Sequence, residues 1–219
     1  MDRDEARARM QEIQRIMERA TLWTHLPGTA AFVGGLLVLA GCGVSYALLR
    51  TFDFADMLGL SVEAQAGLCV MWFAIGAAGL VLEVALTARA AKIQGLFPSI
   101  RSARVAAFAL TPSVLVAMVL TVKFLMPWDQ SWTLMEPSRA EIQYIVPLWM
   151  MLYGTGVYTA GLFSVRAPRI LGGAFIATGV VALPAFPQYG VLWAALSFGL
   201  FHVVFGTYIL AKQRQDRAL

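Results

Sequence analysis

The titratable side chains inside long apolar segments are the residues of this chain whose types could do chemistry. Glu83 is the one acidic residue within such a segment, and it lies six residues before Arg89, where a basic cluster begins. A charged residue inside a membrane is costly and commonly belongs to a proton or ion pathway. We expect Glu83 either to form a proton or cation site or to pair with an Arg or Lys near the membrane surface.

His202 occupies the middle of the last apolar segment, and small residues share its side of a helix. Ala195, Gly199 and Gly206 recur with it at helical spacing, which would let a neighbouring helix approach closely. His202 could therefore form a hydrogen bond with a neighbouring helix, relay protons or contact a ligand. Haem binding is not expected, because the other histidine, His25, lies at the entrance to the first apolar segment, at a different depth.

Aromatic side chains in the fourth apolar segment form a third candidate site. Trp149 and Tyr153 share one helical face with Gly156, and Tyr158 is nearby. A cleft at this position could accept a lipid, a quinone or a pigment. The alternative is ordinary packing between helices, with the polar tips of the rings forming hydrogen bonds.

No pattern typical of catalysis or metal binding accompanies these residues. Two histidines and one intramembrane carboxylate are too few for a metal cage, and the sequence has no phosphate-binding loop, no CxxC motif and no nucleophile paired with a base. Cys42 and Cys69 are expected to be packing residues. Cys42 ends a lipoprotein-like stretch, residues 39–42, but the apolar run continues past it. We therefore predict no enzyme activity, no cofactor and no metal.

The composition of the chain indicates that these residues lie in a membrane. Of the 219 residues, 59% are apolar and 14% are charged, whereas soluble domains average roughly 45–50% apolar and about 25% charged. Six apolar runs are about long enough to cross a bilayer; they cover residues 26–49, 66–88, 105–126, 142–163, 170–186 and 191–211. We predict an all-α, polytopic membrane helix bundle with six transmembrane helices.

The distribution of basic residues predicts the orientation of this bundle. Lys and Arg number 14 in the N-terminal segment, the loops after the second and fourth apolar runs and the C-terminal tail, against three on the other side. Because basic residues accumulate in the cytoplasm, both termini are expected to be cytoplasmic. Arg50, Lys123 and Arg139 then lie on the outer side, where Lys123 can reach the interface by snorkelling. A net charge of +4 has this simple cause, so we expect no nucleic-acid partner.

The chain divides into a short polar segment and the bundle. Residues 1–23 are expected to form a cytoplasmic amphipathic helix, because Met10, Ile13 and Met17 recur at helical spacing among charged residues. Five Arg and five acidic residues cancel in this segment, which disfavours an anionic-lipid anchor. A helix lying at the interface or bound to a partner is expected instead. Residues 24–219 form the predicted transmembrane bundle.

Two stretches resemble a family of uncharacterised small bacterial integral membrane proteins with six spans. Residues 18–28, ERATLWTHLPG, resemble the family's entry into its first span, and residues 189–206, YGVLWAALSFGLFHVVFG, resemble its final span. Pro27 and His25 depart from the serine and the small residue that the family has there. The resemblance implies six spans in a bacterial inner membrane and adds weight to His202, but it implies no activity.

Three functions are consistent with these features. The first is a non-enzymatic sensor, regulator or accessory subunit that binds a membrane-protein partner or a second copy, since catalytic groups and large soluble regions are lacking. The second is a small-solute or proton-coupled carrier that uses Glu83 and His202. The third is a lipid-, quinone- or pigment-binding protein with a cleft near Trp149, Tyr153 and Tyr158.

Overall fold

The computed structural model describes residues 9–10, 28–93, 100–127, 134–162 and 166–218, and these are largely helical. The long helices are α2 (Gly28–Leu49), α3 (Val62–Ile93), α4 (Ile100–Leu125), α5 (Arg139–Gly161), α6 (Arg166–Ala185) and α8 (His202–Ala218). Shorter elements are η1 (Phe54–Gly59), η2 (Pro187–Tyr189), α7 (Gly190–Ala194) and η3 (Ala195–Phe201). The all-α prediction is confirmed for this part of the chain. The predicted amphipathic helix over residues 1–23 lies almost wholly outside it.

Five helical segments of the described chain are long and apolar enough to cross a membrane. They are Gly28–Leu49, Val62–Leu86, Phe108–Leu125, Arg166–Ala185 and Pro187–Gln215. The helix that coincides with the remaining apolar run, α5, has 23 residues and is more polar. It packs against both α4 and α6. A helix that is covered by two neighbours needs a less continuous apolar surface than one that faces lipid on most sides.

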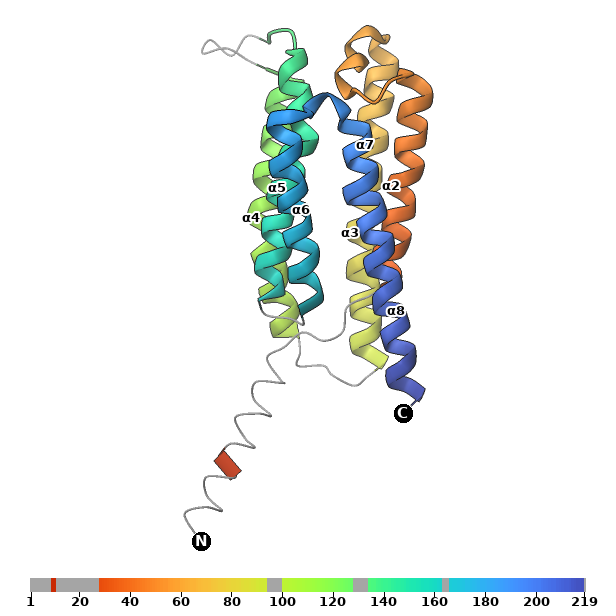
Figure 1. Ribbon diagram of the computed structural model, residues 1–219, viewed down its shortest axis with the longest axis vertical. Coiled ribbons are helices and arrows are strands. Elements are labelled where there is room, and N and C mark those ends of the chain that lie inside the picture. The colour runs from red at the N-terminus through yellow and green to blue at the C-terminus, as the bar shows by residue number, and fades with distance from the viewer. Residues whose placement is uncertain (1–8, 11–27, 94–99, 128–133, 163–165, 219) are drawn as a thin grey trace.

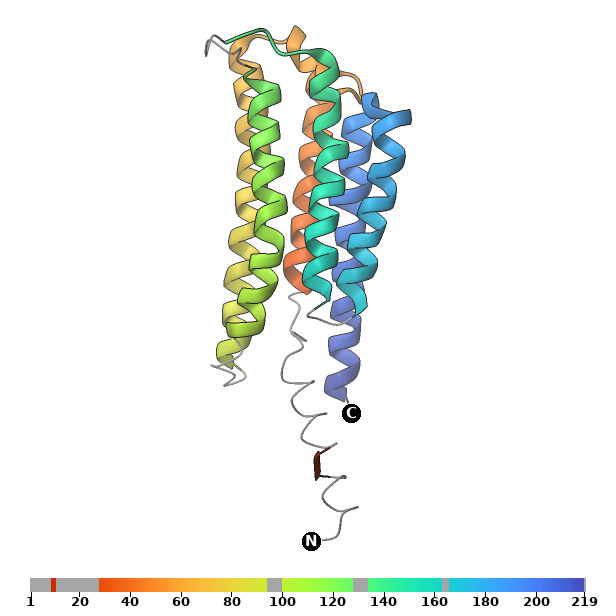
Figure 2. The ribbon, with the colours of Figure 1, turned by 90° about the vertical axis from the view of Figure 1, so that its left-hand side faces the viewer.

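The long helices form two groups, which lie side by side in Figure 1 and one in front of the other in Figure 2. The first group contains α2, α3 and the continuous rod α7–η3–α8, and the second group contains α4, α5 and α6. The chain crosses between the groups where α6 leads through η2 into α7, and η1 lies at the same end of the bundle (Figure 1). We call this end the η1 end.

Close backbone contact at glycines holds each group together. Between α2 and the rod α7–η3–α8, a Cβ atom at Gly35 would lie 2.7 Å from the carbonyl oxygen of Gly199 in η3. Between α5 and α6, a Cβ atom at Gly172 would lie 2.5 Å from the backbone nitrogen of Tyr158. Lipid tails are as apolar as a helix surface, so helix association in a membrane depends on such close packing.

The rod α7–η3–α8 contains a π-helical segment, Ala195–Phe201, that the sequence analysis did not anticipate. In that analysis Ala195, Gly199, His202 and Gly206 were placed on one face of a regular α-helix. In the structure the two glycines contact α2, whereas His202, the first residue after the π segment, contacts α5. Such π segments in helices frequently occur at functional sites.

The two Gly-Gly pairs of the chain allow a matched test of the glycine contacts. Nothing lies within 4 Å of a Cβ atom at Gly34 or Gly173, the neighbours of the packed Gly35 and Gly172. We expect Gly35→Ala and Gly172→Ala to lower the free energy of unfolding by about 1–3 kcal/mol through overpacking. Gly34→Ala and Gly173→Ala should be neutral or stabilising by up to about 1 kcal/mol, because alanine is the better helix former.

Thermal or denaturant unfolding of the purified variants in detergent measures this difference. Equal stability of the two members of a pair would contradict the packing that the structure shows.

Candidate functional site

Two polar clusters join the helix groups. One lies midway along the bundle and consists of Tyr153 and His202; we call it the central pair. The other lies at the η1 end and consists of five side chains that we call the end cluster: Thr51, Asp53, Asp56, Arg139 and Gln143. Each cluster takes residues from both groups, so each bears on how the groups are held relative to one another.

The central pair is a hydrogen bond between the groups. The hydroxyl oxygen of Tyr153 on α5 lies 2.9 Å from Nε2 of His202 at the start of α8. These residues were expected in two different candidate sites, and the tertiary structure brings them together. A hydrogen bond to a neighbouring helix is one of the three roles expected of His202, and this contact corresponds to it.

Phenylalanine rings enclose the central pair. Phe175 on α6 is fully buried, and its ring centroid lies 5.1 Å from that of Tyr153 and 5.5 Å from that of His202. Phe198 lies against the same two rings, at 5.3 Å and 6.4 Å. In such an apolar enclosure a hydrogen bond is electrostatically stronger than in water, and an unpaired polar atom costs more.

The second ring nitrogen of His202 has no hydrogen-bond partner. Carbonyl groups of Ser197 and Phe198 lie beside the ring, but the buried Nδ1 atom forms no hydrogen bond. In either neutral tautomer of the ring, one nitrogen can donate and the other can accept. A buried polar atom left unpaired costs about 1–3 kcal/mol. Nδ1 is therefore an unused donor when it carries the ring proton and an unused acceptor when Nε2 carries it.

Glu83 lies on α3, and its side chain is partly buried. It comes from a different helix of the first group from His202, which begins α8.

The other two aromatic candidates have different neighbours from Tyr153. The indole Nε1 of Trp149 donates to the hydroxyl oxygen of Thr121 on α4 at 2.7 Å, which is a contact within the second group. Tyr158 is 44% exposed. Of the three residues predicted to line one cleft, the structure brings only Tyr153 into the polar site between the groups.

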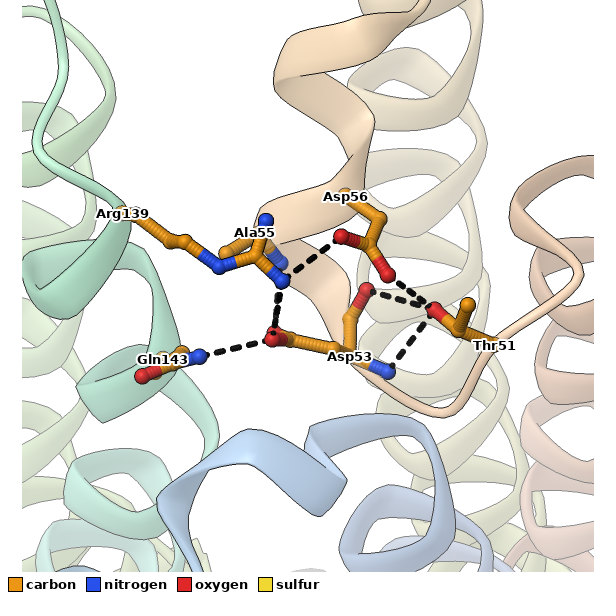
Figure 3. Close-up of polar contacts among 6 residues, drawn as sticks. All are labelled: Thr51, Asp53, Ala55, Asp56, Arg139 and Gln143. Atoms are coloured by element: carbon orange, nitrogen blue, oxygen red, sulfur yellow. Dashed lines mark hydrogen bonds and ion pairs between the residues drawn. The ribbon is translucent and has the colours of Figure 1, made fainter.

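The end cluster forms where the chain leaves α2 and turns into η1. Arg50 adopts a left-handed conformation with φ 60°, which ends the helix and turns the chain back over the bundle. Asp53 then caps η1, because its Oδ1 accepts a hydrogen bond from the Ala55 nitrogen at 2.9 Å. The remaining oxygen of this buried carboxylate faces α5 (Figure 3).

Side chains from the first turns of α5 complete the cluster (Figure 3). An Nη2 atom of Arg139 donates to Asp53 at 2.7 Å and to Asp56 at 2.6 Å. Gln143 donates to Asp53 at 2.6 Å, and the hydroxyl group of Thr51 donates to Asp56. A buried carboxylate is tolerated when it is paired and hydrogen-bonded in this way.

The end cluster was not expected from the sequence, in which Arg139 was only one of three outer basic residues. A usable signal was present, because Asp53 and Asp56 lie in the connection between the first two apolar runs and acidic residues commonly cap helices. Nothing in that signal named Arg139 as the partner.

Comparison of the chain with protein-family models, with curated proteins and with solved structures gives no match. Within the described ranges, no group of three or more His, Cys, Asp or Glu side chains could hold a metal ion. The central pair and Glu83 are titratable groups in a largely apolar surrounding.

Acid is expected to weaken the end cluster by protonating Asp56. The hydrogen bond from Thr51, and then that from Arg139, lowers the pKa of Asp56 below its ordinary value. Such a group stabilises the fold above its unfolded-state pKa of about 3.9, and this stabilisation is lost as pH falls through the lower folded-state value. The unfolding temperature should therefore drop below about pH 4, modestly because Asp56 is partly exposed.

Unfolding temperatures of the parent, Asp56→Asn and Glu136→Gln proteins measured against pH check this expectation. Asp56→Asn should make the unfolding temperature less dependent on pH below about pH 4. Glu136→Gln, which changes an exposed carboxylate, should not. The prediction is contradicted if the unfolding temperature of Asp56→Asn falls in acid as much as that of the parent protein.

The Tyr153–His202 hydrogen bond is tested by a double-mutant cycle. Tyr153→Phe keeps the ring but leaves His202 without its partner at Nε2, so unfolding should become easier by about 1–3 kcal/mol. His202→Leu leaves the tyrosine hydroxyl unpaired in the same way. The double variant should cost less than the sum of the single variants, because it removes both polar groups. Strict additivity of the unfolding free energies would show that the bond contributes nothing.

Proposed function

We propose that this chain is a six-span, non-enzymatic integral membrane protein that acts as a proton-coupled or small-solute carrier, with the central pair and Glu83 as its proton-binding site. The proposal includes both termini in the cytoplasm and, from the resemblance to the uncharacterised bacterial family, location in a bacterial inner membrane. The excess of basic residues on one side of the apolar runs supports this orientation.

The observation that carries the proposal is the unpartnered Nδ1 of His202. Histidine changes its charge more readily near neutral pH than any other side chain. When both ring nitrogens hold protons, Nε2 can donate to the Tyr153 oxygen, 2.9 Å away, and Nδ1 can donate to a carbonyl group or to a solute. A carboxylate at Glu83, on α3 of the same helix group, would offset part of the positive charge of the ring.

Proton flux into liposomes that contain the purified protein tests this function. An internal pH-sensitive dye reports the flux under an imposed pH gradient, alone and with a panel of small solutes. We expect His202→Gln and Glu83→Gln to reduce the protein-dependent flux by about tenfold or more, because intramembrane ionisable groups carry such pathways. Glu63→Gln serves as the control, since it changes an exposed carboxylate at the start of the same helix, α3.

Two results would count against the carrier. One is the absence of protein-dependent flux under all conditions, and the other is equal flux in His202→Gln, Glu83→Gln and the parent protein.

The second candidate is the sensor, regulator or accessory subunit, and the surface of α3 favours it. Val62, Val70, Leu80, Val81 and Val84 are each between 61% and 76% exposed. Such a continuous apolar face is covered in the membrane by lipid, by a partner or by a second copy. Repeated purification of the bare monomer from mild detergent, judged by mass measurement of the intact complex, would oppose this candidate.

A further inference from the structure

The first turns of α5 are inserted into the first group at the η1 end. Ile142 is 1% exposed and belongs to a buried core cluster whose other fully buried members come from α2, η1, α3 and α7. Arg139 and Gln143 flank it in the helix and bind Asp53. The start of α5 therefore contributes both an apolar side chain and polar side chains to the same docking contact.

The two sides of this docking contact are not equivalent. Asp53 is fixed from its own group, since its Oδ1 accepts from the Ala55 nitrogen and caps η1. The side chain of Arg139 is 54% exposed. A guanidinium group at the surface regains water as soon as it leaves its partners, whereas a buried carboxylate does not. Arg139 is therefore the component of the cluster that can separate at the lower cost.

Close approaches between the groups are concentrated toward the η1 end. α5 lies against η1, η2 and α7, and α6 lies against η3. All of these partners belong to the half of the bundle nearest the η1 end (Figure 1). The central pair lies farther along, since Tyr153 is separated from Arg139 by roughly 21 Å of helix rise in α5. Separation of the groups at the η1 end would thus remove the contacts that lie between that end and the central pair.

We infer that the end cluster is a gate. When Arg139 leaves Asp53 and Asp56, the first turns of α5 withdraw from the first group, and water and solute reach the central pair from the η1 end. The role of the end cluster as an entrance for solute rests on the carrier function proposed above. The opening itself is a property of the fold that can be measured without any transport assay.

Reactivity of a cysteine at position 142 measures the opening. The reporter Ile142→Cys is placed in a protein whose native cysteines are replaced (Cys42→Ala, Cys69→Ala) and is held in lipid nanodiscs, where both membrane faces are accessible. A membrane-impermeant maleimide then modifies the thiol group only when the docking contact opens. This arrangement makes the result independent of the orientation in the cell.

Arg139→Gln should raise the modification rate by about tenfold or more, because a local opening becomes easier. Arg139→Lys, which keeps the charge, should give a smaller rise. Arg166→Gln is the matched control, since Arg166 is likewise an exposed first residue of a helix, α6. It should leave the rate unchanged.

A second reporter distinguishes gating from loss of the fold. Ala117 is 2% exposed and lies on α4, which packs against α5 within the second group. In Arg139→Gln a cysteine at this position should stay as slow as in the parent. If the reporter at 142 does not fold, Ala55→Cys, at a fully buried position of η1, replaces it.

Two outcomes overturn the inference: an unchanged rate at the η1 end in Arg139→Gln, or an equal rise at both reporters. If no protein-dependent proton flux is found but Arg139→Gln raises the modification rate at the η1 end, the carrier function is overturned and the opening of the end cluster stands.

Discussion

Close approach of helix backbones at glycine is the contact on which the architecture of this bundle depends. The surroundings of a membrane helix are as apolar as its own surface, so burying leucine or valine between helices contributes little free energy. Van der Waals attraction between closely packed atoms then has to hold the helices together. This attraction requires positions where two helix backbones can approach closely. α2 meets α8 at Gly35, and α5 meets α6 at Gly172. These contacts make each helix group a unit.

The interface between the groups rests on different interactions. Its middle consists of aromatic rings around the Tyr153–His202 hydrogen bond, and its η1 end consists of Arg139 and Gln143 bound to Asp53. Hydrogen bonds and ion pairs can be exchanged for water or broken by a proton, whereas a glycine contact has no substitute partner. Motion of one group against the other should therefore cost less than motion within a group, and the carrier proposal depends on this difference.

His202 combines one structural hydrogen bond with a second ring nitrogen that has no hydrogen-bond partner. The bond from its Nε2 to Tyr153 is what a histidine that only packs would form with a neighbouring helix. Buried polar atoms are nearly always paired, however, and each exception needs a reason. The free Nδ1 atom among phenylalanine rings is such an exception. It is the reason for assigning His202 a proton-binding role in addition to its packing role.

The helices could be predicted from the sequence because the length of an apolar run is a local property. The run over 26–49 corresponds to Gly28–Leu49, and that over 170–186 corresponds to Arg166–Ala185. Such runs do not say which face of a helix meets which neighbour, since every face is compatible with lipid. The regular period assumed for residues 191–211 also missed the π segment, because hydropathy is the same in α and π turns.

The amino-acid sequence by itself thus determined the all-α class, the positions of the helices and the rarity of charges within them, among which Glu83 and His202 were visible. Only the tertiary structure decided the pairings. Tyr153 and His202 are 49 residues apart in the chain, and Arg139 and Asp53 are 86 apart. Polar side chains in an apolar surrounding must find partners, but which partners they find depends on how the glycine contacts orient the helices.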